Sequence, residues 1–161
     1  MLEISKAAAL VVETLRENKK KIAFAESCTG GGIATAITSV SGSSEVFDCG
    51  IVSYSNEIKE SVLGVSAQVL ADFGAVSAET AAQMVLGVMR LSGADLAISV
   101  TGIAGPDGGS AEKPVGLVYI ALADSSGVVS VDRHVFSGDR AEVRAQTVAS
   151  ALLTALNYIG K

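Results

Sequence analysis

The first part of the chain shows two different patterns of apolar and polar positions. Apolar residues recur at helical spacing over residues 4–15, which predicts an amphipathic first helix that ends in a lysine run at residues 19–21. Residues 22–25 then form a short, continuous apolar run of the kind that is typical of a buried strand. The chain is therefore expected to begin with a helix followed by an interior strand.

The same patterns continue along the rest of the chain. Further strands are predicted at residues 46–54, 95–101, 115–123 and 128–136, and further helices at residues 56–63, 66–73, 77–91 and 139–158. A turn at residues 124–127 joins the last two strands as a hairpin. Helices between the early strands and a hairpin near the end favour an α/β fold of three layers (α/β/α) with a mixed sheet, as a single domain over residues 1–161.

Composition and charge narrow the class of protein. Hydrophobic residues make up 49% of the 161 positions and charged residues 18%, so we expect a compact globular domain. A net charge of −5 without a long basic run argues against a nucleic-acid partner. The charged N-terminal segment and the lack of a long apolar run argue against a signal peptide and a membrane partner. Two cysteines without CxxC spacing suit a reducing compartment, and we expect a cytoplasmic protein.

Residue types that are rare in the chain exclude several chemistries. His134 is the single histidine and lies on a predicted strand, where we expect it at the surface or at an edge. One histidine makes a zinc site of the usual kind improbable, and a Ser-His-Asp triad would need His134 itself. The phosphate-loop motif and the dinucleotide fingerprint are both absent from the sequence. We therefore expect neither a metal nor a cofactor.

The stretch AESCTGGGIATAI, residues 25–37, places a serine directly after the first strand. Ser27 lies where successive backbone N–H groups and a helix dipole favour negative charge, which suits a nucleophile with an oxyanion hole. In the alternative interpretation, Ser27 or Thr29 only caps a helix that runs to about Val40, and the glycines permit close packing. Cys28 is a further candidate nucleophile, because helix N-termini lower the pKa of a thiol.

A second cluster, YSNEIK, begins at Tyr54 and ends at Lys59, again where a strand meets a helix. If the first two strands are neighbours, these two junctions meet. Lys59, with a pKa lowered by the helix dipole, by desolvation or by nearby cations, could then accept the proton of Ser27. Alternatively Lys59 is solvated and pairs with Glu57 or Glu60. Tyr54 could position the lysine or stack on a planar ring.

A third cluster combines a glycine-rich loop with two arginines. The loop TGIAGPDGGS, residues 101–110, carries backbone N–H groups that can form an anion-binding nest, although a flexible connector has the same composition. Arg140 and Arg144 lie one turn apart at the start of the last predicted helix, where the helix dipole opposes them. They would suit a phosphate clamp, or else exposed ion pairs with Asp139 or Glu142.

Taken in order, AESCTGG, YSNEIK, TGIAGPDGGSAEKPVG and GDR..VR closely resemble the motifs of the CinA C-terminal family. The resemblance runs over about residues 6–155. Larger CinA members carry an additional N-terminal domain to which nothing here corresponds, so the chain is similar to the single-domain members, which include nicotinamide mononucleotide deamidases of the PncC type.

The resemblance implies metal-free hydrolysis of the carboxamide of nicotinamide mononucleotide (NMN) to nicotinic acid mononucleotide and ammonia, in pyridine-nucleotide recycling. It implies Ser27 as nucleophile, Lys59 as general base and Tyr54 as an assisting residue, with oxyanion donors among the amides of residues 29–31. The substrate-binding residues that we expect are Thr29, Gly30, Gly31, Asn56, Gly102, Gly105, Gly108, Gly109, Arg140 and Arg144.

Two further expectations concern alternatives and assembly. A CinA-like domain that binds a nucleotide and acts through protein partners is the alternative function, although such a module would need neither Ser27 nor Lys59. A cysteine-dependent amidase that uses Cys28 is a third hypothesis. The apolar helix around residues 81–91 suggests a homodimer, although burial in the core explains the same pattern.

Overall fold

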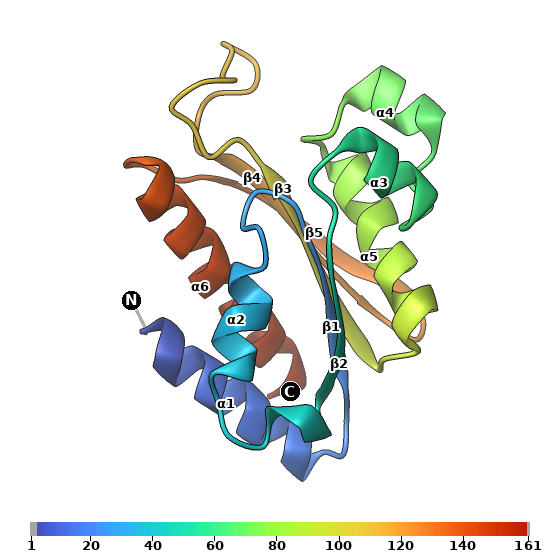
Figure 1. Ribbon diagram of the computed structural model, residues 1–161, viewed down its shortest axis with the longest axis vertical. Helices are drawn as coiled ribbons and strands as arrows, with labels where there is room; N and C mark the ends of the chain where they lie inside the picture. The colour runs from blue at the N-terminus through green and yellow to red at the C-terminus, as the bar shows by residue number, and fades with distance from the viewer. Residues whose placement is uncertain (1–2, 161) are drawn as a thin grey trace.

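The computed structural model describes residues 3–160, which form one mixed sheet of five strands. The strand order is β2-β1-β3-β4-β5 (Figure 1). The first three strands of this order are parallel, and the last two are antiparallel and form the predicted hairpin. Their bounds are β1 Ile22–Glu26, β2 Phe47–Val52, β3 Leu96–Gly102, β4 Leu117–Asp124 and β5 Gly127–Val135.

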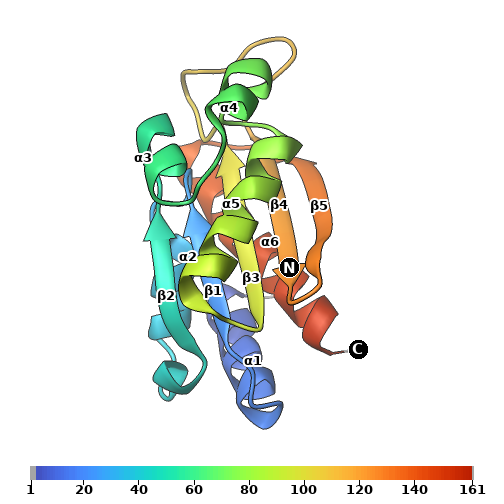
Figure 2. The same cartoon turned by 90° about the vertical axis from the view of Figure 1, so that its right-hand side faces the viewer.

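Helices cover both faces of this sheet, which confirms the expected three-layer arrangement (Figures 1 and 2). One layer holds α1 (Ile4–Glu17), α2 (Gly32–Thr38) and α6 (Arg140–Ile159). The other holds α3 (Asn56–Ser61), α4 (Ala67–Phe73) and α5 (Ala78–Ser92), and a 3-10 helix, η1 (Ser43–Glu45), precedes β2. None of the helices within residues 3–160 has both the length and the apolarity that a membrane span requires.

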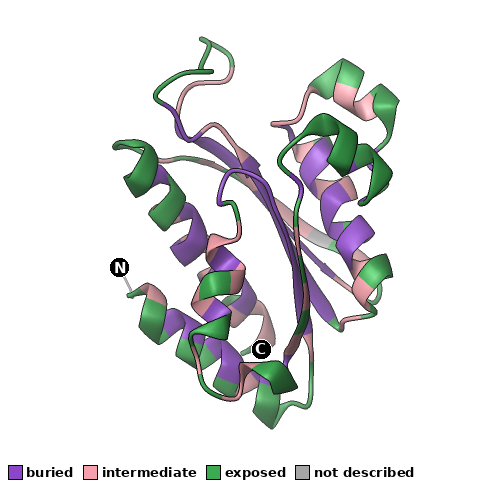
Figure 3. Ribbon diagram, in the orientation of Figure 1, coloured by how far each residue is buried: buried purple, intermediate pink, exposed green. Residues whose placement is uncertain are grey.

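The two faces of the sheet carry side chains of different size. Large side chains such as Phe24 and Ile98 fill the core against α1, α2 and α6, whereas alanines line the face that meets α5. These small side chains let α5 approach closely, and buried residues follow the inner surfaces of α1, α5 and α6 (Figure 3). Helix α5 also lies close to the α3–α4 connection, because a Cβ at Gly87 would lie 2.0 Å from the carbonyl oxygen of Leu63.

Side-chain caps start four of the predicted helices, and Ser66 caps α4 by accepting a hydrogen bond from the Val69 amide. Ser55 accepts a hydrogen bond from the Ile58 amide, Ser77 from the Thr80 amide, and Asp139 forms a capping box with Glu142. Helices α1 and α2 have no such cap, and α2 differs most from its predicted bounds. It begins at Gly32 and ends at Thr38, with Gly31 in the N-cap position, so the expected cap at Ser27 or Thr29 and the extension to about Val40 are wrong.

The topology brings the carboxyl ends of β1, β2 and β3 to one edge of the sheet. After β1 the chain turns to α2 on one face, and after β2 it turns to α3 on the other (Figure 1). Such divergence leaves a crevice at the strand ends of α/β sheets. Because β1 and β2 are neighbours, the two strand-to-helix junctions that carry Ser27 and Lys59 meet there, as the sequence predicted.

Candidate active site

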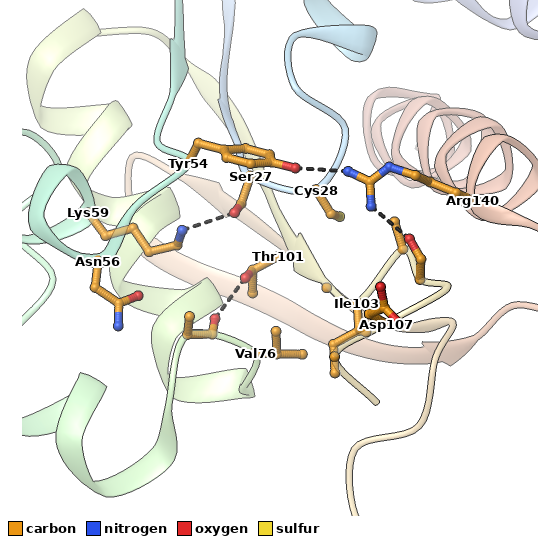
Figure 4. A pocket seen from close by; sticks show the side chains of 15 residues that line it. Ser27, Cys28, Tyr54, Asn56, Lys59, Val76, Thr101, Ile103, Asp107 and Arg140 are labelled. Carbon is orange, nitrogen blue, oxygen red and sulfur yellow. Dashed lines mark hydrogen bonds between the residues drawn. The ribbon is translucent and has the colours of Figure 1, made fainter. Parts of the chain in front are cut away.

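A cavity of about 290 Å³ lies at this edge of the sheet (Figure 4). Its size is near the lower end of ligand pockets, which span roughly 300–1,000 Å³. Five segments contribute lining residues: the end of β1, the β2–α3 junction, the α4–α5 connection, the end of β3 with the loop that follows it, and the first turn of α6. The lining includes the predicted Ser27, Tyr54, Asn56, Lys59, Gly102, Gly105, Gly108 and Arg140.

Ser27 is held by a continuation of the sheet. Its amide donates to the carbonyl of Val100 at 3.0 Å, which extends the β1–β3 pairing by one residue beyond the strand. The side chain is 9% exposed and its hydroxyl faces Lys59 (Figure 4). A nucleophile on the end of a central strand has a position that the rigid part of the fold determines.

Glu26 organises the turn that follows the serine, a role that sequence reasoning missed. Its buried carboxylate accepts hydrogen bonds from the Thr29 hydroxyl at 2.5 Å and from the amides of Gly31 (3.1 Å), Ile33 (3.1 Å) and Ala34 (2.8 Å). Glu26 thus satisfies the free amides at the start of α2 in place of a local cap. A charged residue that ends an otherwise apolar strand was the signal in the sequence.

The turn after Ser27 leaves fewer free hydrogen-bond donors for a substrate than the sequence suggested. Thr29 is fully buried with its hydroxyl turned to Glu26, and the Gly30 amide donates to the Ser27 carbonyl at 3.0 Å. The Gly31 amide is bound to Glu26. The expectation that the Gly30 and Gly31 amides serve as oxyanion donors is therefore corrected, because both already have acceptors within the protein.

Lys59 reaches the serine from α3. Its side chain is 1% exposed, and its Nζ lies 2.9 Å from the Ser27 Oγ and 2.7 Å from the Ser53 carbonyl oxygen. The alternative of a solvated lysine paired with a neighbouring glutamate is therefore wrong. Ser53 is the second residue that sequence reasoning missed, because it contributes through its backbone carbonyl.

Burial lowers the pKa of Lys59 from its usual 10.5, and the nearby Cys28 partly opposes this shift. Desolvation is therefore the dominant cause among the three that the sequence left open. A neutral amine keeps two N–H donors and gains a lone pair. It can then donate to the Ser53 carbonyl while it accepts the proton of Ser27, which is the geometry of a general base beside a nucleophile.

Cys28 lines the pocket but is poorly suited to be the nucleophile. Its side chain is buried, and burial raises the pKa of the thiol from 9.0 to about 11, although Lys59 and Arg144 lower it in part. Because the thiolate is the reactive form, this thiol stays protonated at neutral pH. The structure does not favour the hypothesis of a cysteine-dependent amidase.

Arg140 and Arg144 make hydrogen bonds to different parts of the protein. Arg140 donates to the Tyr54 hydroxyl at 3.0 Å and to the Gly105 carbonyl at 2.8 Å, which links α6 to two other walls of the pocket (Figure 4). Arg144 donates instead to the carbonyls of Cys28 (3.2 Å) and of residue 29 (2.9 Å). Arg140 and Arg144 both line an adjacent apolar groove of about 640 Å³, whereas Arg140 alone of the two also lines the pocket at Ser27, so a phosphate clamp of two arginines stays a prediction that concerns the groove.

The glycine-rich loop after β3 forms the far wall of the pocket. Gly105 and Gly108 have φ of +81° and +89°, a left-handed backbone that favours glycine and bends the loop over the site. Gly109 instead packs on Val115, which a Cβ would meet at 2.9 Å. The Lys113 Nζ donates to the Phe73 carbonyl at 2.5 Å and ties this loop to α4, so the loop is not a free connector.

Several other lining residues were not singled out from the sequence, among them Val76 in the α4–α5 connection, Thr101 in β3, and Ile103 and Asp107 in the loop. His134 lies on the edge strand β5, stacked on Phe136 with ring centroids 5.1 Å apart. Within residues 3–160, no three side chains of His, Cys, Asp or Glu gather so as to hold a metal ion. The pocket therefore centres on the Ser27–Lys59 pair.

Comparison with known proteins agrees with these motifs and this geometry. The sequence model of the CinA C-terminal domain matches residues 4–159. The chain belongs to this family. As a CinA C-terminal domain it has close structural relatives: competence/damage inducible protein CihA from Agrobacterium tumefaciens is 42% identical with a TM-score of 0.95, covering 100% of this chain and 99% of that one. A CinA superfamily protein from Klebsiella pneumoniae is 33% identical with a TM-score of 0.95, covering 99% of each chain.

Curated relatives of this CinA domain have two different lengths. Nicotinamide-nucleotide amidohydrolase PncC from Enterobacter agglomerans is 54% identical over 135 residues, which cover 84% of this chain and 82% of that protein. A putative competence-damage inducible protein from Thermoanaerobacter sp. (strain X514) is 51% identical over 93% of this chain but only 36% of that protein. The chain thus spans about a third of the length of several curated relatives that it matches.

Proposed function

We propose that this CinA domain hydrolyses the carboxamide of NMN to nicotinic acid mononucleotide and ammonia, in pyridine-nucleotide recycling. The observation that carries the proposal is the buried Lys59 amine 2.9 Å from the Ser27 hydroxyl, with a lowered pKa. The name of the Enterobacter relative, a nicotinamide-nucleotide amidohydrolase, supports the choice of substrate. A domain that only binds nucleotides has no need of such a pair.

In the first step, neutral Lys59 takes the proton of Ser27 as its Oγ attacks the amide carbon. The tetrahedral intermediate collapses when Lys59 returns the proton to the nitrogen, which leaves as ammonia. An ester then joins Ser27 to the nicotinoyl group. In the second step, Lys59 deprotonates a water molecule that attacks this ester, and the proton returns to Ser27.

The remaining pocket residues are assigned to binding. Asn56 lines the pocket beside Lys59 (Figure 4), and we assign its amide to the carboxamide of the substrate. Arg140, held in place by Tyr54 and Gly105, is assigned to the phosphate. Because binding of a remote phosphate contributes to orientation at the carbonyl, we expect free nicotinamide to be a poor substrate.

Location and assembly complete the proposal. The two free cysteines suit a reducing, cytoplasmic environment. Leu86 and Leu91 are 40% and 51% exposed on α5, and such exposed leucines suit a surface that a second copy covers in a homodimer.

The deciding experiment measures ammonia and nicotinic acid mononucleotide after incubation of EDTA-treated protein with NMN. Ser27→Ala and Lys59→Ala variants are assayed beside the wild type. We expect release by the wild type alone, because both side chains are needed and no metal is. Binding of NMN without release would instead favour the nucleotide-binding module that acts through partners.

A further inference from the structure

One carboxylate in the pocket has no role in the steps above. Asp107 lies in the loop after β3, between the left-handed residues Gly105 and Gly108, and lines the cavity together with Ser27 and Lys59. Within residues 3–160 its carboxylate has neither a hydrogen-bond partner nor an ion pair, even though Arg140 lines the same cavity. Of the lining residues, all of which the structure describes, it carries the one carboxylate.

Asp107 is exposed to solvent, and its free carboxylate does not help the proposed chemistry at the carboxamide. Attack on an amide builds negative charge on the carbonyl oxygen, and an anionic side chain in the same pocket opposes that charge. Asp107 lies across the pocket from Lys59 (Figure 4), and burial and Cys28, rather than Asp107, perturb the pKa of the lysine. The carboxylate is therefore available to the part of a bound substrate that is remote from the reacting carbon.

The chemistry of NMN supplies a matching group. Its ring nitrogen is quaternary and positively charged, and it lies away from the ring carbon that bears the carboxamide. The ribose and phosphate extend from this same nitrogen. A pose with the carboxamide at Ser27 and the ring nitrogen toward the far wall would direct the ribose and phosphate onward in the same direction. Asp107 and Arg140 both lie on that side of the pocket (Figure 4).

We propose that Asp107 is a specificity-determining residue that selects substrates with a positively charged ring. This inference rests on the proposed function and extends it to the charge state of the substrate. Asp107 and Arg140 together present one negative and one positive group to a substrate that carries both charges. A neutral ring of the same shape gains nothing from Asp107.

The test compares NMN with its reduced 1,4-dihydro form, which has the same phosphate and carboxamide but an uncharged ring. The variant is Asp107→Asn, and the matched control is Glu112→Gln, which removes the same charge from an exposed position of the same loop. The assays measure the KM and kcat of NMN and the inhibition constant of the reduced form as a competitor.

We expect Asp107→Asn to raise the KM of NMN by about two- to five-fold, as for one partly solvated charge pair, and to leave the inhibition constant of the reduced form unchanged. Glu112→Gln should change neither constant. An equal loss for both ligands would overturn the inference, because Asp107 would then only shape the loop, and so would the absence of any change. If the wild type did not hydrolyse NMN, the proposed function would fail, while calorimetric binding of the two ligands would still test Asp107.

Discussion

Replacement of Lys59 by methionine tests the proposed mechanism most directly. Methionine fills a similar volume without a polar atom, and the lysine stem is already buried. The change removes the amine that contacts Ser27 at 2.9 Å and Ser53 at 2.7 Å. A general base contributes about 10²–10⁴-fold to a rate. We therefore expect kcat for NMN to fall by that factor, which is roughly 3–5 kcal/mol of activation free energy.

Activity and stability should both change with pH in a defined direction. The pKa of Lys59 is lowered by burial, and the neutral amine is the active base, so wild-type kcat/KM should rise with pH through the lowered pKa and then level off. Stability should follow the same direction. Between the folded-state pKa and the usual 10.5, the unfolded chain binds a proton that the folded chain does not, so the free energy of unfolding rises with pH. In the Lys59→Met variant, neither kcat/KM nor the free energy of unfolding should show this rise with pH.

The assay follows ammonia release across pH, and chemical denaturation measures stability at the same pH values. Lys20→Met is the matched control, because Lys20 is exposed and lies in the α1–β1 connection at the opposite end of the sheet. It should keep wild-type activity and its pH profile. A Lys59→Met variant that retained more than about a tenth of wild-type kcat, well above the loss expected of a general base, would refute the role of the lysine.

Three further substitutions test the surroundings of the pair. Cys28→Ala should keep kcat near the wild-type value because the thiol, with a pKa of about 11, stays protonated; a loss as large as that of Ser27→Ala would contradict this. Glu26→Gln should lower the free energy of unfolding by about 1–3 kcal/mol, since an amide cannot accept all four hydrogen bonds, whereas the exposed Glu13→Gln should be neutral in the same urea titration. Gly87→Ala should cost about 1–3 kcal/mol through the clash with Leu63, and an unchanged urea midpoint would count against that close approach.

Much of the fold was predictable because its signals are local. Apolar runs identified the interior strands, and the predicted starts of two helices, Ser77 and Asp139, are the residues that cap them. The start of α2 was not predictable by the same rules. Its free amides are satisfied by Glu26, which precedes Ile33 by seven residues and belongs to the strand, so no side chain at the N-cap position marks the helix.

The part of the site that follows from the order of the strands was predictable. Ser27 and Lys59 each follow a strand, and parallel neighbours bring such junctions together. The burial of Lys59 was not predictable, because the neighbouring glutamates in the sequence favour a solvated lysine. Only the tertiary structure shows what surrounds the side chain. The contribution of Ser53 and the binding of Arg144 to loop carbonyls also escaped prediction, since backbone acceptors carry no sequence signature.

The distance between the proposed base and nucleophile depends on the sheet rather than on the loops. The Ser27 amide pairs with the Val100 carbonyl of β3 at 3.0 Å, and the Ser53 amide pairs with the Glu26 carbonyl of β1 at 2.8 Å. Both bonds continue the strand pairing past the strand ends, and the Ser53 carbonyl in turn holds Lys59. A shift of β2 against β1 would therefore move the lysine away from the serine while most of the core stays packed. Catalysis should consequently be more sensitive than stability to changes between these two strands.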